Sequence, residues 1–247
     1  MLLRSSFLLL LFFTLHQSSA QSFFDKTVKR AQQIVSAPSS PLPFSESEAA
    51  EALREALRNG IRRGVQQVNI TDGYFKNPQI KIPFPPQAAA VENTLRSAGM
   101  NKLADDVVLS CNRAAEQAAD AALPIFADAI TNLSIQDAIQ LVKSKENDAA
   151  TRLLERTTTE PLVLAFRPAV QKALDATYAT RYWKQATTYY NRLPLVRKVN
   201  TDLTDFVTRK AVAGLFVLIA KEEAQIRRDP AARVTDLLQR VFGQTKP

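Results

Sequence analysis

Two neighbouring glutamates, Glu222 and Glu223, interrupt an apolar stretch near the end of the chain. On a helical wheel, Leu215, Ile219 and Ile226 form one stripe, with Glu222 inside it and Glu223 at its edge. A carboxylate on such a stripe must find a cation or take up a proton, because burial disfavours its charge. The two side chains could therefore serve as a general acid and base, or anchor a cationic ligand group.

The same glutamates also have a structural interpretation. Arg227 and Arg233 follow within a few helical turns, and a carboxylate–guanidinium pair would fix how the last two helices pack. We predict this arrangement, a structural ion pair made by Glu222 with Arg227 and Arg233. Glu222 and Glu223 stay as the candidates for catalysis, and no other catalytic residue is expected.

A second cluster combines aromatic rings with cations between residues 178 and 192. It holds four of the five tyrosines and the only tryptophan. Amphipathic rings beside cations suit a membrane interface, a sugar polymer or stacked bases, but rings at helical spacing also pack into cores, leaving the cations solvated. The candidate ligand-binding residues are Tyr178, Arg181, Tyr182, Trp183, Lys184, Tyr189, Tyr190 and Arg192.

Histidine and cysteine chemistry is largely excluded. His16 is the only histidine and lies in an N-terminal segment expected to be removed, so Ser–His or Cys–His catalysis and histidine zinc sites are not predicted. Cys111 is the only cysteine, which excludes an intrachain disulfide. It falls on an apolar helix face and is expected to be a small core side chain.

Oxygen ligands for a cation are also poorly placed. Asp105, Asn112 and Glu116 share the polar face of an alanine-rich helix, but Asp105 and Glu116 are three turns apart, about 16 Å along the axis. We expect this to be a solvated face and predict neither a metal site nor a cofactor.

The positive charge of the chain is concentrated in its C-terminal part. The net charge is +8, yet residues 21–151 hold 14 Lys and Arg against 15 Asp and Glu. Residues 152–247 hold 17 against 9. This favours an anionic partner for the C-terminal part, although net charge can also serve solubility alone.

The first twenty residues have the pattern of a signal peptide. Arg4 is followed by an apolar run, Phe7–Leu15, and then by the small residues Ser18–Ala20. The run is too short for a bilayer span of about 20 residues. We predict an exported, soluble chain that begins at Gln21; the alternative is an uncleaved anchor.

The remainder is predicted to be a single all-α domain, an irregular multi-helix bundle over residues 46–243. Residues 21–45 form a short amphipathic helix and a Pro/Ser linker, and 244–247 a tail. Ser45 and Glu48 make a capping box for the first helix of the domain. Further helices are expected over 87–98, 101–122, 134–145, 147–156, 202–228 and 230–243, with Pro161, Pro168 and Pro194 separating two more.

One proline-framed segment, about 73–86, is predicted to be extended. Ile80, Ile82 and Phe84 alternate with polar or proline positions, which is the period of an extended chain. We prefer a strap that lies across the helices with these side chains in a groove. A two-stranded ribbon, or an edge offered to a partner chain, is the alternative.

Several blocks of this sequence resemble a bacterial family catalogued as domain of unknown function 4197, over about residues 47–243. They are "DGYFKNPQIKIPFP", "NRAAEQAA" and "DFVTRKAVAGLFVLIAKEEAQIRRDPAARVTDLLQRVFG". The resemblance implies a helical envelope protein of Gram-negative bacteria with no established reaction or cofactor. Many relatives look like lipoproteins with a cysteine after the signal segment, whereas this chain has Gln21 there.

The combined prediction is a non-catalytic periplasmic binding module. Its basic, aromatic C-terminal half would face an anionic envelope component such as a lipid, a polysaccharide or an envelope protein, and nucleic acid is not expected. Two alternatives stay open: a carrier with an apolar cavity between helices, and a histidine-independent hydrolase that uses Glu222 and Glu223.

Overall fold

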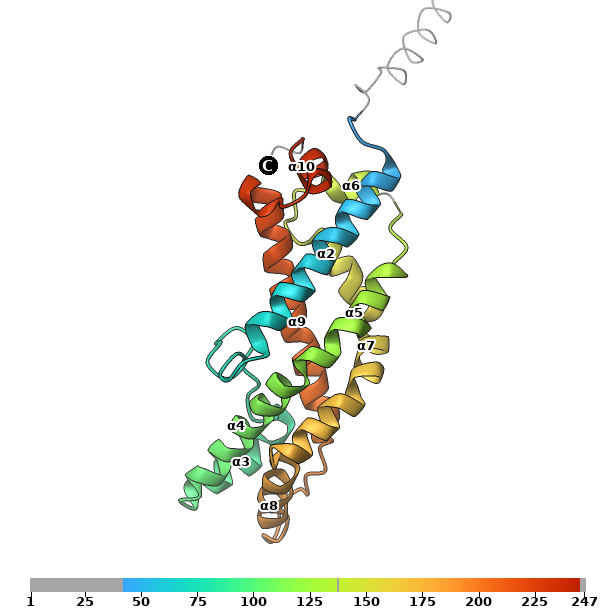
Figure 1. Ribbon diagram of the computed structural model, residues 1–247. Helices are drawn as coiled ribbons and strands as arrows, with labels where there is room; N and C mark the ends of the chain where they lie inside the picture. Colours follow the sequence, from blue (N-terminus) through green and yellow to red (C-terminus); the bar gives the residue numbers. More distant parts are fainter. Residues whose placement is uncertain (1–41, 137, 245–247) are drawn as a thin grey trace, which may run out of the picture. The chain divides into compact units, whose positions relative to one another are not determined.

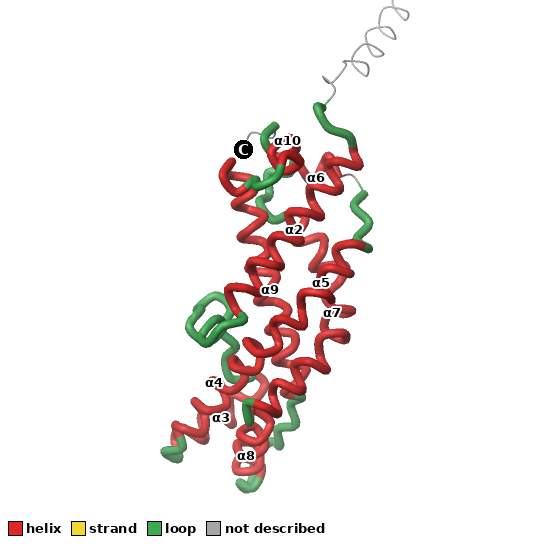
Figure 2. Tube along the Cα trace, viewed as in Figure 1, coloured by secondary structure: helices red, strands yellow, loops and turns green. Residues whose placement is uncertain are grey.

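The computed structural model describes residues 42–136 and 138–244. The predicted signal peptide and the 21–41 segment lie outside the described residues. Within them the chain is helical and contains no strand, so the all-α prediction is confirmed (Figures 1 and 2). The helices are α2 (Glu46–Val68), α3 (Ala89–Ser97), α4 (Asn101–Ala118), α5 (Ala122–Thr131), α6 (Ala138–Val142), α7 (Ala149–Ala176), α8 (Ala179–Asn191), α9 (Leu203–Arg228) and α10 (Asp236–Phe242).

Helix α9 is central to this body and packs most extensively against α2 and α7 (Figure 1). The stripe Leu53, Leu57, Ile61 and Val65 of α2 is buried, as its spacing predicts. Gly60 lets the two backbones approach closely, because a Cβ there would lie 3.0 Å from Cγ2 of Ile219. The core therefore forms where two long apolar stripes meet along a glycine-containing helix face.

Local capping fixes several helix ends where the sequence predicts them. Ser45 and Glu48 form the capping box of α2, with the Glu48 amide donating to Ser45 Oγ at 3.2 Å and the Ser45 amide donating to Glu48 Oε2 at 2.8 Å. Asp202 caps α9 by accepting from the Asp205 amide at 3.0 Å. Gly99 follows α3 with a φ of +76°, the left-handed conformation that glycine permits.

Helix α7 contradicts the predicted breaks. It runs unbroken for 28 residues through Pro161 and Pro168, so the predicted helix end near 156 and both proline boundaries are wrong. A proline inside a helix removes one hydrogen bond and crowds the preceding turn. The buried side chains Leu162, Phe166 and Val170 outweigh that cost by packing into the core. The helix predicted over 134–145 is likewise reduced to α6.

The proline-framed segment is less extended than predicted. Over residues 70–80 the chain makes successive turns, including Lys76 N–H to the Asp72 carbonyl at 3.1 Å and Lys81 N–H to the Asn77 carbonyl at 2.8 Å. The prediction of an extended chain is therefore wrong for 73–80, and no part of the described chain pairs with it as a ribbon. Its apolar side chains Ile80, Ile82 and Phe84 are nevertheless buried, as the strap interpretation predicts.

Two polar residues of α4 hold this strap, and the prediction of a solvated face is wrong for both. Asn112 is fully buried; its Oδ1 accepts from the Ile82 amide at 2.9 Å and its Nδ2 donates to the Ile82 carbonyl at 2.8 Å. Glu116 Oε1 accepts from the amides of Tyr74 and Phe75 at 3.0 and 3.1 Å. Only Asp105 of the predicted set is exposed to solvent.

Tyr74 anchors the other side of the strap. It is completely buried, and its hydroxyl donates to the Ala211 carbonyl of α9 at 2.9 Å. Burial raises the pKa of Tyr74, and the nearby Glu116 carboxylate raises it further. The strap is therefore bound to α4 on one side and to α9 on the other by hydrogen bonds in the interior.

Replacing Asn112, which anchors the strap, is expected to lower the free energy of unfolding. Asn112→Ala leaves the amide and carbonyl of Ile82 without a partner in the interior, which costs about 2–4 kcal/mol of unfolding free energy. Urea unfolding followed by circular dichroism measures this loss. The matched control is Asn132→Ala, whose exposed side chain donates only to the Asp128 carbonyl. Equal stabilities for the two variants would contradict the anchoring role of Asn112.

Candidate functional site

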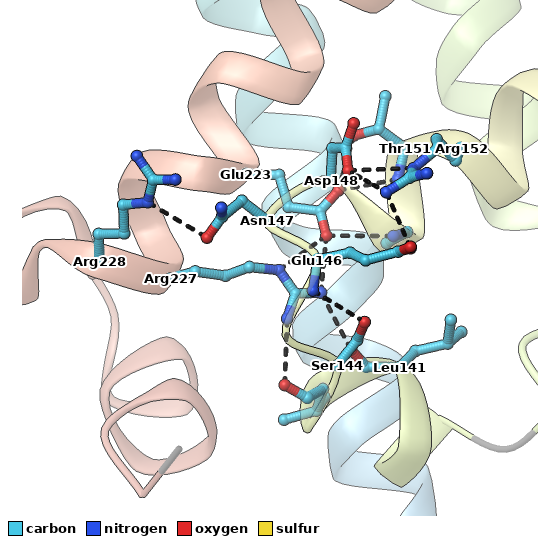
Figure 3. A network of polar contacts seen from close by, with 12 residues as sticks. Leu141, Ser144, Glu146, Asn147, Asp148, Thr151, Arg152, Glu223, Arg227 and Arg228 are labelled. Atoms are coloured by element: carbon cyan, nitrogen blue, oxygen red, sulfur yellow. Dashed lines mark hydrogen bonds and ion pairs between the residues drawn. The ribbon is translucent and has the colours of Figure 1, made fainter. Parts of the chain in front are cut away.

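Glu223 and Arg227 form a buried ion pair on successive turns of α9 (Figure 3). Arg227 Nε and Nη2 lie 2.9 and 2.7 Å from Glu223 Oε1. The side chains are 0% exposed for Glu223 and 7% exposed for Arg227. A pair this deeply buried contributes to stability only when the remaining hydrogen-bonding capacity of both groups is also satisfied.

That capacity is satisfied by the ends of two other helices. Glu223 accepts from the Ala150 and Thr151 amides, at 3.1 and 2.8 Å, and from the Thr151 hydroxyl at 2.7 Å. It thus caps the N-terminus of α7, whose own N-cap residue makes no side-chain cap bond. Arg227 donates to the carbonyls at the end of α6, Val142 at 3.0 Å and Leu141 at 3.1 Å.

Glu222 points to a different helix and a different cation. It forms an ion pair with Arg63 of α2, so the predicted pairing of Glu222 with Arg227 and Arg233 is wrong. Arg233 instead donates to the carbonyls of Ile226 and Arg227, at 2.8 and 2.9 Å. Arg63 is far away in sequence, so proximity along the chain could not identify it.

The environment of Glu222 shifts its protonation. Burial raises the pKa of Glu222 above its usual range, and the Arg63 guanidinium partly opposes that shift. The Glu222 side chain is only 6% exposed, whereas that of Arg63 is 41% exposed. The cation therefore remains hydrated while the carboxylate loses most of its water.

These two glutamates do not assemble a catalytic pair. Glu223 receives its five hydrogen bonds from α7 and Arg227, while Glu222 faces α2. Neither residue lines either of the grooves described below. An acid–base role needs a carboxyl within hydrogen-bond reach of a substrate, and this geometry does not supply one.

The predicted aromatic cluster divides between core and surface. Trp183 and Tyr190 are buried, and Trp183 donates its Nε1–H to the Thr201 carbonyl at 3.2 Å. The Trp183 ring also packs on Phe84 of the strap, with centroids 5.7 Å apart. Tyr178 is 60% exposed. Helix α8 is therefore held by two of its rings, while its other two, Tyr182 and Tyr189, are half-buried.

The outer face of α8 lines an open groove of about 700 Å³. Five of the eight predicted ligand-binding residues meet there: Tyr178, Arg181, Lys184, Tyr189 and Arg192. Sequence reasoning missed the other lining residues, Met100, Asp175, Thr180, Gln185 and Thr188. Thr180 and Gln171 donate to Asp175 and keep its pKa below the usual value, so the groove contains three cations and one carboxylate.

The cations of this region are not neutralised by ion pairs within the described part of the chain. Residues 176–201 contain five Lys and Arg and no Asp or Glu, and none of the five makes an ion pair with a described carboxylate. Arg209 of α9, in contrast, pairs with both Glu160 and Asp205. The α8 end of the body is thus a concentrated positive surface, in which Asp175 is the one carboxylate that lines the groove.

A second groove, of about 520 Å³, lies between α5 and α7. Its lining is largely apolar, with Asp128 as its one acidic residue: Ile125, Asp128, Ala129, Asn132, Leu133, Ser134, Thr157, Thr158, Pro161, Leu162 and Ala165. Sequence reasoning did not predict it, because it depends on how two helices pack.

Three other observations bear on the chemistry of the chain. Cys111 is buried, and burial raises the pKa of its thiol to about 12. Across residues 42–136 and 138–244, no three histidine, cysteine or acidic side chains gather as metal ligands. No helix in that part of the chain is long and apolar enough to cross a bilayer.

The two adjacent glutamates are expected to differ in how much stability is lost when each is neutralised. Glu223→Gln leaves the buried Arg227 without its counter-charge and is expected to lower the unfolding free energy by about 3 kcal/mol or more. Glu222→Gln leaves only the half-exposed Arg63, which water can solvate, so its cost is expected to be small. Urea unfolding at neutral pH compares them, and a larger loss for Glu222→Gln would contradict this assignment.

The effect of Glu222→Gln on stability is expected to depend on pH. A carboxyl with a raised pKa favours the folded state when protonated, and that contribution is lost as the pH rises through the folded pKa. Glu222→Gln should therefore gain stability relative to the wild type as the pH rises from the ordinary glutamate value of 4.5 towards neutrality. Thermal unfolding at several pH values measures the difference, and a pH-independent difference would argue against a raised pKa.

Comparisons with known proteins identify the domain that carries these features. The family described as "Protein of unknown function (DUF4197)" matches residues 43–243, which include α2 to α10 and both grooves. No curated protein and no solved structure matches the chain. Because the match spans most of the sequence, the chain belongs to the DUF4197 family.

Proposed function

We propose that this protein is a non-catalytic binding module, exported to the periplasm, whose α8 groove binds an anionic envelope component. The observation that carries the proposal is the group of cations in the groove, Arg181, Lys184 and Arg192, which have no carboxylate partner among the described residues. Most surface arginines elsewhere in this body do have one, such as Arg209 and Arg152.

The groove's tyrosines add a second kind of contact. Tyr178 and Tyr189 line it together with the three cations. An aromatic ring with a hydroxyl offers both an apolar face and a hydrogen-bonding end, which suits a ligand that joins an anionic group to a sugar or glycerol unit. This combination favours a lipid headgroup or an acidic polysaccharide over a bare inorganic anion.

Export is supported by the sequence of residues 1–20, with its basic start, short apolar run and small residues before Gln21. An exported location also explains why nucleic acid is not the proposed anion, despite the positive charge.

A second candidate function is carriage of an apolar ligand. It is favoured by the largely apolar groove between α5 and α7. Ala165→Trp would fill that groove from an exposed position of α7. Binding of a fluorescent fatty acid that this substitution abolishes would support the carrier function.

Neutralising the groove is expected to weaken binding to an anionic matrix. Arg181→Ala with Lys184→Ala should lower the salt concentration that elutes the protein from heparin, because each cation near an anionic surface contributes about 1 kcal/mol. Both side chains are exposed and make no ion pair with a described residue, so the fold should not change. Trp183→Ala would not serve, because Trp183 is buried.

The matched control removes the same charge elsewhere. Lys143→Ala with Lys145→Ala changes two exposed cations between α6 and α7, at the other end of the helical body from α8 (Figure 1). The control should elute close to the wild type. Equal shifts for the two double variants would indicate attraction by net charge alone and would contradict a specific groove.

A further inference from the structure

The connection between α8 and α9 is a closed loop tied at its neck. Asn191, the last residue of α8, accepts from the Val199 amide at 2.9 Å and donates to the Val199 carbonyl at 3.0 Å. Just beyond this pair, the Trp183 indole N–H bonds the Thr201 carbonyl. Both ends of the 192–198 stretch are therefore fixed to α8, and the residues between them project as a loop.

The tip of this loop presents a leucine to solvent. Leu195 is 106% exposed relative to a reference chain, the most exposed large apolar side chain of the described residues. Its φ is +64°, the left-handed region that leucine rarely adopts. A strained apolar residue at a tied loop tip indicates a functional constraint, because asparagine or glycine would relieve the strain and remain soluble.

Three cations flank this leucine in the sequence of the loop. Arg192, Arg197 and Lys198 are exposed within three residues of it, and the acid-free stretch 176–201 includes the whole loop. Arg192 also lines the α8 groove. Arg192 therefore links the loop to the groove in one basic surface, and the short apolar run 193–196 lies at the tip of the loop.

We propose that this surface docks on an anionic phospholipid bilayer, with Leu195 inserted at the headgroup–acyl boundary and the loop cations on lipid phosphates. The proposal rests on the proposed function, since it names a phospholipid membrane as the anionic component. Burying an apolar side chain below the headgroups while cations contact them is the arrangement of interfacial membrane binding. Each loop cation is expected to strengthen binding about fivefold.

The apolar tip distinguishes a bilayer from the other anionic partners. A soluble acidic polysaccharide offers no apolar phase, so Leu195 would stay in water on that partner. A stable protein interface needs an apolar centre within at least about 1,000 Å² of buried surface, and a run of four apolar residues at the tip of a basic loop does not supply that centre. A membrane accommodates both features without requiring a complementary shape.

Co-sedimentation with vesicles tests the proposal. The full chain is expressed in a bacterial host, and the wild type and the variants are purified in the same way, so that they share one N-terminus. The vesicles contain equal parts phosphatidylglycerol and phosphatidylcholine. Leu195→Asn keeps the left-handed backbone, which asparagine tolerates, and removes only the apolar tip. It is expected to weaken vesicle binding about tenfold, the effect of exposing one leucine, and to leave heparin elution unchanged. Leu164→Gln, at an exposed position of α7, should bind vesicles like the wild type.

A label at the tip reports insertion directly. Leu195→Cys can be labelled with an environment-sensitive dye, because the only other cysteine, Cys111, is buried and its pKa is raised. The dye should shift to blue emission on the anionic vesicles and stay unchanged on heparin, whereas a dye on Leu164→Cys should shift on neither.

The possible results distinguish membrane insertion of Leu195 from anion binding by the α8 groove. Loss of vesicle binding in Arg181→Ala/Lys184→Ala, with no effect of Leu195→Asn and no dye shift, would overturn the insertion of Leu195 and leave binding of anionic groups by the groove alone. Unchanged vesicle and heparin binding in both variants would overturn both proposals. Equal binding to pure phosphatidylcholine vesicles would overturn the role of the cations.

Discussion

The buried pair of Glu223 and Arg227 is the interaction on which the upper part of the helical body depends. Helix α7 lacks a side-chain cap of its own, and α6 has only five residues, too few to be stable alone. Glu223 supplies the cap of α7, and Arg227 binds the carbonyls that end α6 (Figure 3). One turn of α9 therefore fixes where two other helices begin and end.

How far the sequence predicts this structure depends on how local each determinant is. The capping box at Ser45 and the cap at Asp202 were predictable, because each involves residues three positions apart. The uninterrupted α7 was not, because its prolines are tolerated through packing that only the fold creates. The partner of Glu222 was missed for the same reason: Arg63 lies 159 positions away. Helical periodicity identifies the polar face of a helix but not what covers that face. Asn112 and Glu116 were therefore predicted to be solvated, although the strap buries them.

The candidate site likewise combines features that the sequence predicts with features that depend on the fold. Composition alone predicts a basic aromatic cluster, and five of its residues do line one groove. The helical periodicity could not show that Trp183 lies inside, because its burial depends on the strap and on the Thr201 carbonyl. Met100 joins the groove from the turn between α3 and α4, and no pattern in its own neighbourhood indicates this.

The strap and the proposed binding surface are mechanically connected. Asn112 of α4 fixes Ile82, and two residues later Phe84 packs on Trp183, which helps to orient α8. From α8, Asn191 in turn ties the loop that carries Leu195. A surface fixed in this way needs little further ordering when it binds, and ordering side chains and loops is a principal cost of association. In the proposed function, Asn112 would thus contribute to binding without touching a ligand, because the contacts that start from it help to orient α8 and the loop that α8 holds.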